Sequence, residues 1–185
     1  MGEITDAIER AGQQHFTRRP PVTLKGQIGF LIRRLGSAKA VAAEIGVTAD
    51  SVNRYRRGAR KHARPDVAAR IHGAVTSRWQ PQVRQRRQRQ AATTGGITVE
   101  TRARFGYTAP IGTSDDNRLR RLTVHLPPAY AQRLFNARDT GADDRELRAI
   151  VADGFKDVYF QDGGTRAIGL SDVQLTDIDY LDLDY

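Results

Sequence analysis

Residues 37–58 read SAKAVAAEIGVTADSVNRYRRG, and this stretch decides the fold expected for the first half of the chain. Ser37 is a favoured N-cap for a first helix. Gly46 suits the tight turn that follows, because glycine adopts positive φ without a steric penalty. Thr48 then caps a second helix, and Gly58 ends it. Two short helices joined by such a turn predict a helix-turn-helix over 37–58.

The two helices are expected over Ala38–Ile45 and Ala49–Arg57, with their apolar residues on facing sides. The buried set would be Val41, Ala42, Ile45, Val47, Val52 and Tyr55. In a DNA-binding helix-turn-helix the second helix enters the major groove. Its DNA-contacting residues would be Ser51, Asn53, Arg54 and Arg57, followed downstream by Arg60 and Lys61. A protein-binding helical module is the alternative.

Outside the motif, a helix is expected before it, over about Lys25–Leu35, and another after it, over Asp66–Trp79. Residues 80–90, QPQVRQRRQRQ, then form a basic arm, which either continues as a helix along the DNA backbone or stays flexible. The arm residues expected to contact phosphates are Arg84, Arg86 and Arg87. With roughly six phosphate contacts in all, the log–log salt slope of binding would be about −5.

The charge is unevenly distributed along the chain, whose net charge is +9. Residues 1–92 hold 19 Lys+Arg against 6 Asp+Glu, whereas residues 93–185 hold 11 against 15. Arginine predominates among the basic residues, and its planar fork suits phosphate. We therefore expect an α+β protein in two parts: a helical DNA-binding domain over 1–92 and an α+β domain over 93–185.

The second half alternates between strand and helix patterns. Residues 97–107 alternate apolar and polar side chains, as a half-buried strand does, and 119–126 give a second strand. Helices are expected over about 128–138 and from Asp143 or Asp144 to Phe160, and the tail from Ser171 is expected to be a third strand. The sequence thus predicts a small antiparallel sheet covered by helices.

The C-terminal tail is acidic, with five Asp among the last 21 residues. If it lies in the same sheet as residues 97–107, its carboxylates would complement Arg102 and Arg104 across the strands. Repulsion of DNA from this end of the chain is the other reading of the same charge.

Several classes of protein lack support in the sequence. There is no cysteine for disulfides or thiolate metal sites, the four His are dispersed, and no phosphate-binding loop or nucleophile elbow is present. An enzyme using Asp115 and Asp116 with a metal is an open alternative, but we expect no catalytic residue, metal site or cofactor in the chain itself. Without a signal pattern or an apolar run of 18 residues, the chain is expected to be soluble, cytoplasmic and nucleoid-associated, with no membrane partner.

The segment between the first two expected strands carries several hydroxyls. Residues 108–117 would form a loop that presents Thr108, Thr113 and Ser114 beside Asp115 and Asp116. A hydroxyl offered on a projecting loop can be the substrate of another protein's active site. The plainer interpretation is that Thr113 or Ser114 caps the turn before the two Asp residues.

Much of the chain resembles one family. The passages KAVAAEIGV, VNRYRRG, RPDVAARI, RWQPQVR, QAATTGGITVETRARFGYTAPIGTSDD, LPPAYAQRLF, VYFQDGG and TDIDYLDLD are similar to the terminal proteins that cap linear Streptomyces chromosomes and plasmids. The resemblance implies a protein that binds telomeric DNA together with a telomere-associated protein. It further implies that a threonine hydroxyl primes end-patching synthesis and stays covalently linked to the 5′ end.

The resemblance places the priming residue in the loop over 108–117, with Thr113 as the match and Ser114 as the alternative; Thr108 and Tyr107 are less favoured. A partner DNA polymerase would supply catalysis and its Mg²⁺ ions. The rival function is a non-covalent helix-turn-helix transcriptional regulator whose second half serves dimerisation or effector binding.

Overall fold

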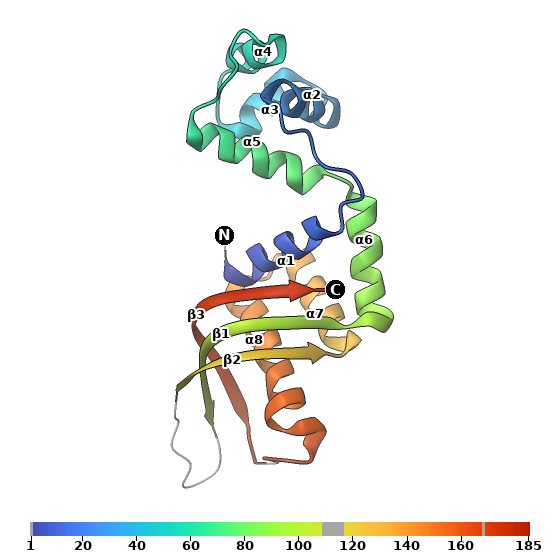
Figure 1. Ribbon diagram of the computed structural model, residues 1–185, viewed down its shortest axis with the longest axis vertical. Coiled ribbons are helices and arrows are strands. Elements are labelled where there is room, and N and C mark those ends of the chain that lie inside the picture. The colour runs from blue at the N-terminus through green and yellow to red at the C-terminus, as the bar shows by residue number, and fades with distance from the viewer. Residues whose placement is uncertain (1, 109–116, 168) are drawn as a thin grey trace. The chain divides into compact units, whose positions relative to one another are not determined.

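The computed structural model describes residues 2–108, 117–167 and 169–185, and it shows an α+β fold with an antiparallel sheet, as predicted (Figure 1). The chain divides into two units. One, here called the helical unit, is Phe16–Val83; the other, the sheet unit, is Met1–His15 together with Arg84–Tyr185. This division differs from the expected boundary between 92 and 93, because both ends of the predicted first domain belong with the sheet.

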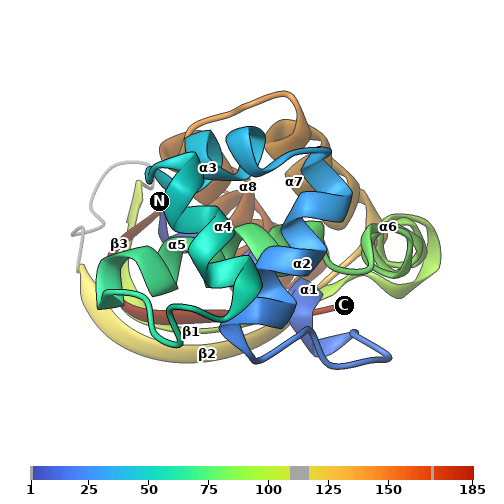
Figure 2. The same cartoon turned by 90° about the horizontal axis from the view of Figure 1, so that it is seen from above.

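The helical unit consists of four helices whose bounds agree with the sequence patterns to within one residue. They are α2 (Leu24–Leu35), α3 (Ala38–Ile45), α4 (Ala49–Arg57) and α5 (Pro65–Arg78), all labelled in Figure 2. The side chains of Thr23, Ser37 and Thr48 each accept a hydrogen bond from the backbone N–H three residues on. Capping of this kind satisfies one of the N–H groups that a helix start leaves without a partner.

The helical unit has its own apolar core. The buried residues come from all four helices: Ile28, Phe30, Leu31, Val41, Ala42, Ile45, Val52, Tyr55, Val67, Ile71, Ala74 and Val75. Trp79 closes this core at the end of α5, where its ring lies edge-on to Phe30 at 5.0 Å between centroids. The indole Nε1 donates to the carbonyl of Arg18 (2.8 Å), which ties the segment before α2 to the end of α5.

The sheet unit contains three antiparallel strands in the order β2-β1-β3. These are β1 (Ile97–Thr108), β2 (Arg118–Leu126) and β3 (Asp172–Asp184). Helices α7 (Pro128–Asp139) and α8 (Asp144–Phe155) cover one face, and α8 continues into a π-turn over Lys156–Phe160 (Figures 1 and 2). The covered face is the apolar face predicted from alternation, with Ile97, Val99, Thr101, Ala103 and Phe105 all buried.

A helix that the sequence patterns above did not predict, α1 (Glu3–Gln14), completes the sheet unit. Its buried residues Ile4, Ala7, Ile8 and Ala11 join the core of the sheet rather than that of the helical unit. The carboxylate of Asp144, at the start of α8, accepts hydrogen bonds from the backbone N–H groups of residues 3, 4 and 5 at 3.0–3.2 Å. The apolar spacing in 4–11 is the signal that would have identified this helix.

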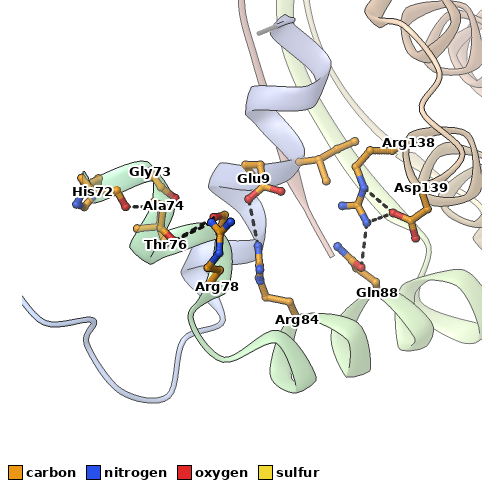
Figure 3. Close-up of polar contacts among 12 residues, drawn as sticks. Glu9, His72, Gly73, Ala74, Thr76, Arg78, Arg84, Gln88, Arg138 and Asp139 are labelled. Atoms are coloured by element: carbon orange, nitrogen blue, oxygen red, sulfur yellow. Dashed lines mark hydrogen bonds and ion pairs between the residues drawn. The ribbon is translucent and has the colours of Figure 1, made fainter. Parts of the chain in front are cut away.

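The basic arm is helical from Pro81 onward, which settles the alternative between helix and flexible arm. Helix α6 (Pro81–Gln90) continues into a π-turn over Ala91–Gly95. Figure 3 shows how α6 is held: Arg84 donates to Glu9 of α1 (3.1 Å), and Gln88 accepts from Arg138 of α7 (3.3 Å). These contacts are the physical reason why α6 from Arg84 onward belongs to the sheet unit.

The acidic tail pairs with the basic strand, as predicted. Arg102 of β1 forms an ion pair with Asp179 (3.2 Å), and Arg104 forms one with Asp177 (3.5 Å). A bulge in β3 makes both possible, since Arg102 pairs in register with Tyr180 but Arg104 with Thr176. Asp177 takes a positive φ of 45° in this bulge, a conformation that Asp tolerates better than most residues.

Candidate nucleic-acid interface

The turn between α3 and α4 sets the direction of the polar face of α4. Gly46 adopts φ 65° and ψ 46°, the left-handed conformation that glycine enters without strain. The next residue, Val47, donates its N–H to the carbonyl of Ala42 (3.0 Å), so that the end of α3 is closed before Thr48 caps α4. Both helices and the turn therefore exist as predicted; their role as a DNA-binding helix-turn-helix remains a prediction.

The four predicted contacts on α4 lie on its solvent side or at its flanks, whereas Val52 and Tyr55 are buried on the opposite side. Arg54 and Arg57 are exposed, and Asn53 and Ser51 are partly exposed. The Ser51 hydroxyl lies 3.0 Å from Thr48 Oγ1, and the guanidinium of Arg57 donates from Nε to the carbonyl of Asn53 (3.4 Å). The structure thus brings the predicted α4 residues onto one helix surface.

The two predicted contacts after α4 are also exposed. The N–H of Arg60 donates to the carbonyl of Arg54 (3.4 Å), which folds the following segment back against the end of the helix. Lys61 comes next in this segment and is exposed. Arg56 is a further exposed cation on α4; it is not among the predicted DNA contacts, because it lies toward the flank of the helix instead of its outermost side.

The charge of the chain is concentrated in the helical unit. Residues 16–83 contain 14 Lys+Arg and 3 Asp+Glu, a net charge of +11. The three acids Glu44, Asp50 and Asp66 pair with arginines of the same unit. Ten cations then have no carboxylate partner among the described residues: Arg18, Arg19, Lys25, Arg33, Arg34, Lys39, Arg56, Arg57, Arg60 and Lys61. Such an excess favours binding of a polyanion.

The arm residues divide into two kinds. Arg86 and Arg87 are exposed on α6, and Arg87 donates to Gln90 of the same helix (3.4 Å). The side chain of Arg84 is 14% exposed and is committed to Glu9. The geometry therefore does not support the predicted phosphate contact of Arg84, whose charge is used inside the sheet unit.

The outer face of the sheet also carries arginines, but its own acids neutralise them. Besides the pairs of Arg102 and Arg104, Arg121 donates to Glu100 (2.8 Å), which also accepts from the Tyr180 hydroxyl (3.0 Å). The hydrogen bond from Arg121 holds the pKa of the Glu100 carboxyl below its ordinary value. This face therefore offers a polyanion much less net positive charge than the helical unit does.

The predicted priming residues Thr113 and Ser114, and the acidic pair Asp115 and Asp116, lie outside the described residues. The strands that bracket them are described: Phe105 of β1 pairs in register with Arg118 of β2. Asn117 accepts a hydrogen bond at its carbonyl from Arg104 (3.0 Å). Tyr107, the less favoured acceptor, is partly buried and packs against the core of the sheet unit.

Neither a metal site nor a membrane span is found in the described part of the chain. No group of three His, Asp or Glu side chains lies close enough there to hold a metal ion. No described helix combines the length and apolar character needed to cross a membrane. Comparison with known proteins returned no matching family model, curated protein or solved structure.

Proposed function

We propose that this chain binds duplex DNA through its helical unit, with α4 in the major groove, and that it serves as the protein primer at the ends of a linear replicon. The observation that carries the proposal is the net charge of +11 on residues 16–83, with ten cations outside any ion pair among the described residues, around an exposed polar helix face. The DNA-contacting residues of the helical unit are Ser51, Asn53, Arg54, Arg57, Arg60 and Lys61. Separately, Arg86 and Arg87 on α6, which belong to the sheet unit, would contact phosphates.

Priming is the finer part of the proposal and draws on the resemblance to terminal proteins. The oxygen of the Thr113 hydroxyl, or of Ser114, attacks the α-phosphorus of a deoxynucleoside triphosphate held by a partner polymerase. A phosphoester bond to the protein forms, pyrophosphate leaves, and the hydroxyl proton passes to a base or water in the polymerase site. The polymerase supplies two Mg²⁺ ions for this transfer, and the chain contributes the position of the nucleophile. A telomere-associated protein would direct the complex to telomeric DNA.

The decisive experiment is nucleotide labelling followed by peptide mapping. The full chain is incubated with an α-labelled deoxynucleotide, a template carrying the terminal sequence of the replicon and a polymerase extract. Trypsin releases residues 105–118 as one peptide, FGYTAPIGTSDDNR, which contains Tyr107, Thr108, Thr113 and Ser114. Fragmentation of the labelled peptide should place the nucleotide on Thr113.

Matched variants separate priming from DNA binding. Thr113→Ala should abolish labelling without changing duplex affinity, and Ser114→Ala should leave labelling intact; the reverse pattern would assign the nucleophile to Ser114. Sequence-specific binding to an internal symmetric site, with no adduct under conditions that label a known terminal protein, would refute priming. A transcriptional regulator, whose DNA-binding unit would be the same residues 16–83, would then be the better account.

A further inference from the structure

One acid lies on the outermost side of α4, in a surface otherwise dominated by cations. Asp50 and Arg54 are four residues apart and therefore lie one above the other on the helix. Arg54 Nε is 2.8 Å from Asp50 Oδ2, and the two side chains are 54% and 61% exposed. The pair thus sits on the face that the proposed function directs toward DNA.

The position of the carboxylate determines which atoms of Arg54 remain available. A guanidinium has five N–H donors, one on Nε and four on the two terminal nitrogens. Asp50 approaches from the Nε side, and no hydrogen bond among the described residues uses the terminal nitrogens of Arg54. Those two nitrogens form the fork that matches the O6 and N7 acceptors of guanine in the major groove.

No carboxylate holds either of the other arginines of α4 among the described residues. Arg57 directs Nε to the carbonyl of Asn53 in its own helix through a longer contact (3.4 Å), and Arg56 has no carboxylate partner. An exposed ion pair one turn apart stabilises a helix only slightly, and a carboxylate next to phosphates opposes binding. Asp50 also lies in the first turn of α4, where an acid stabilises the helix modestly through the helix dipole. That effect does not require a contact with Arg54, whereas the orientation of the guanidinium does.

We propose that Arg54 recognises a guanine base by donating from its two terminal nitrogens to O6 and N7, and that Asp50 is the positioning residue that orients the guanidinium. This assignment rests on the proposed DNA binding by α4. It names the base read by the interface and gives Asp50 a role in specificity instead of affinity. Breaking the pair releases Arg54 to contact phosphates, which carry no sequence information.

The test uses the full chain and a duplex that it selects from a random-sequence pool. Each G·C pair of that duplex is replaced in turn by A·T, and the ratio of the two dissociation constants is measured by fluorescence anisotropy. At one position the wild type should discriminate by roughly 5- to 150-fold, as expected for a bidentate contact. Replacing that guanine by 7-deazaguanine, which lacks N7, should also weaken binding.

Variants then assign the roles of the two residues. Arg54→Ala should lose discrimination at that position alone. Asp50→Ala should reduce the ratio of the two dissociation constants severalfold. Its affinity for a random duplex should stay equal or rise, because a negative charge has been removed. Asp50→Glu should restore most of the ratio. The matched control is Asp66→Ala, which removes an acid from the first turn of α5, where it pairs with Arg70 four residues on. It changes the net charge equally and should leave the ratio unchanged.

Two results would overturn the assignment while DNA binding stands. One is an unchanged ratio in Asp50→Ala with equally increased affinity for all duplexes, which makes Asp50 a repulsive charge only. The other is an equal loss of affinity for all duplexes in Arg54→Ala, which makes Arg54 a phosphate contact. A wild-type chain that binds no duplex would refute the proposed function itself and this assignment with it.

Discussion

Replacement of Ile8 by alanine tests whether α1 belongs to the sheet unit. Ile8 is 1% exposed and lies in the same apolar cluster as the inner face of β1. A boundary between residues 92 and 93 would instead place it with the helical unit. The two divisions of the chain therefore predict different consequences for the same substitution.

The magnitude follows from the burial of the side chain. Truncating a fully buried Ile to Ala costs about 2–5 kcal/mol of unfolding free energy, through lost apolar transfer and the cavity left behind. Alanine recovers only a few tenths of a kcal/mol in helix propensity. With an m-value of roughly 1.5 kcal/mol per M in urea, the unfolding midpoint of the sheet unit should fall by about 1–3 M.

Two spectroscopic probes distinguish the units. The chain has one tryptophan, Trp79, and it packs in the core of the helical unit. Its fluorescence therefore reports unfolding of that unit, while far-ultraviolet circular dichroism reports both. In Ile8→Ala the fluorescence midpoint should remain at its wild-type urea concentration, and part of the dichroism change should move to lower urea.

A matched substitution gives the opposite expectation. Ile71 is 0% exposed in α5, within the core of the helical unit, so Ile71→Ala should lower the fluorescence midpoint by a similar free energy. If Ile8→Ala lowers the Trp79 midpoint as much as Ile71→Ala does, the two cores do not unfold separately. The assignment of α1 to an independent sheet unit would then be refuted.

Three further predictions concern backbone strain, pH and salt. Gly96→Ala should destabilise the sheet unit by at least about 1–3 kcal/mol, because φ is 69° and a Cβ would lie 2.3 Å from the carbonyl oxygen of Leu126. Gly73→Ala in α5, where nothing lies within 4 Å of the added atom, should stabilise the helical unit by about 0.5–1 kcal/mol. For each variant, an unchanged wild-type urea midpoint of the affected unit would contradict the expectation. The hydrogen bond from Arg121 lowers the pKa of Glu100 in the folded chain. The ionised Glu100 carboxylate therefore stabilises the fold fully above the ordinary Glu pKa of about 4.3, and this stabilisation is lost as the pH falls through the lowered pKa of the folded state. The dichroism midpoint should therefore decline as the pH falls below about 4.3, less steeply in Glu100→Gln, and parallel pH curves would exclude this contribution. Duplex affinity should fall with salt at a log–log slope of about −5, which anisotropy titrations between about 50 and 200 mM salt would measure; a slope near zero would exclude phosphate contacts as the main source of affinity.

Local sequence determined most of the secondary structure of this protein. Ser37 and Thr48 cap the helices they were expected to cap, because the hydroxyl that satisfies the first N–H groups lies within three residues of them. Gly46 ends α3 for an equally local reason, its access to positive φ. Alternation over 97–107 likewise fixed which face of β1 is buried, since successive side chains on a strand point to opposite sides.

The sequence was less informative about which charges are free to meet DNA. Arg84 and Arg86 stand in the same basic run, yet the first is held by Glu9, 75 residues away, and the second is exposed. The pair of Asp50 and Arg54 is different, because its four-residue spacing could have been read from the sequence. Contacts between distant segments decided the first case, and helix geometry alone decides the second.

The sequence by itself thus determined most of the helices, the strands and the surplus of positive charge, while the tertiary structure alone decided how the chain is divided. The apolar residues on one side of α1 show that the helix packs against another apolar surface, but they do not specify which one. In the structure α1 packs against the sheet unit. The carboxylate of Asp144, 140 residues after Ile4, accepts a hydrogen bond from the backbone N–H of Ile4, and the carbonyl of Leu181 accepts one from Arg10 (2.7 Å). Burial is non-directional, so an amphipathic helix packs wherever both its apolar face and its unsatisfied end groups find partners, and that choice depends on the folded positions of residues far along the chain.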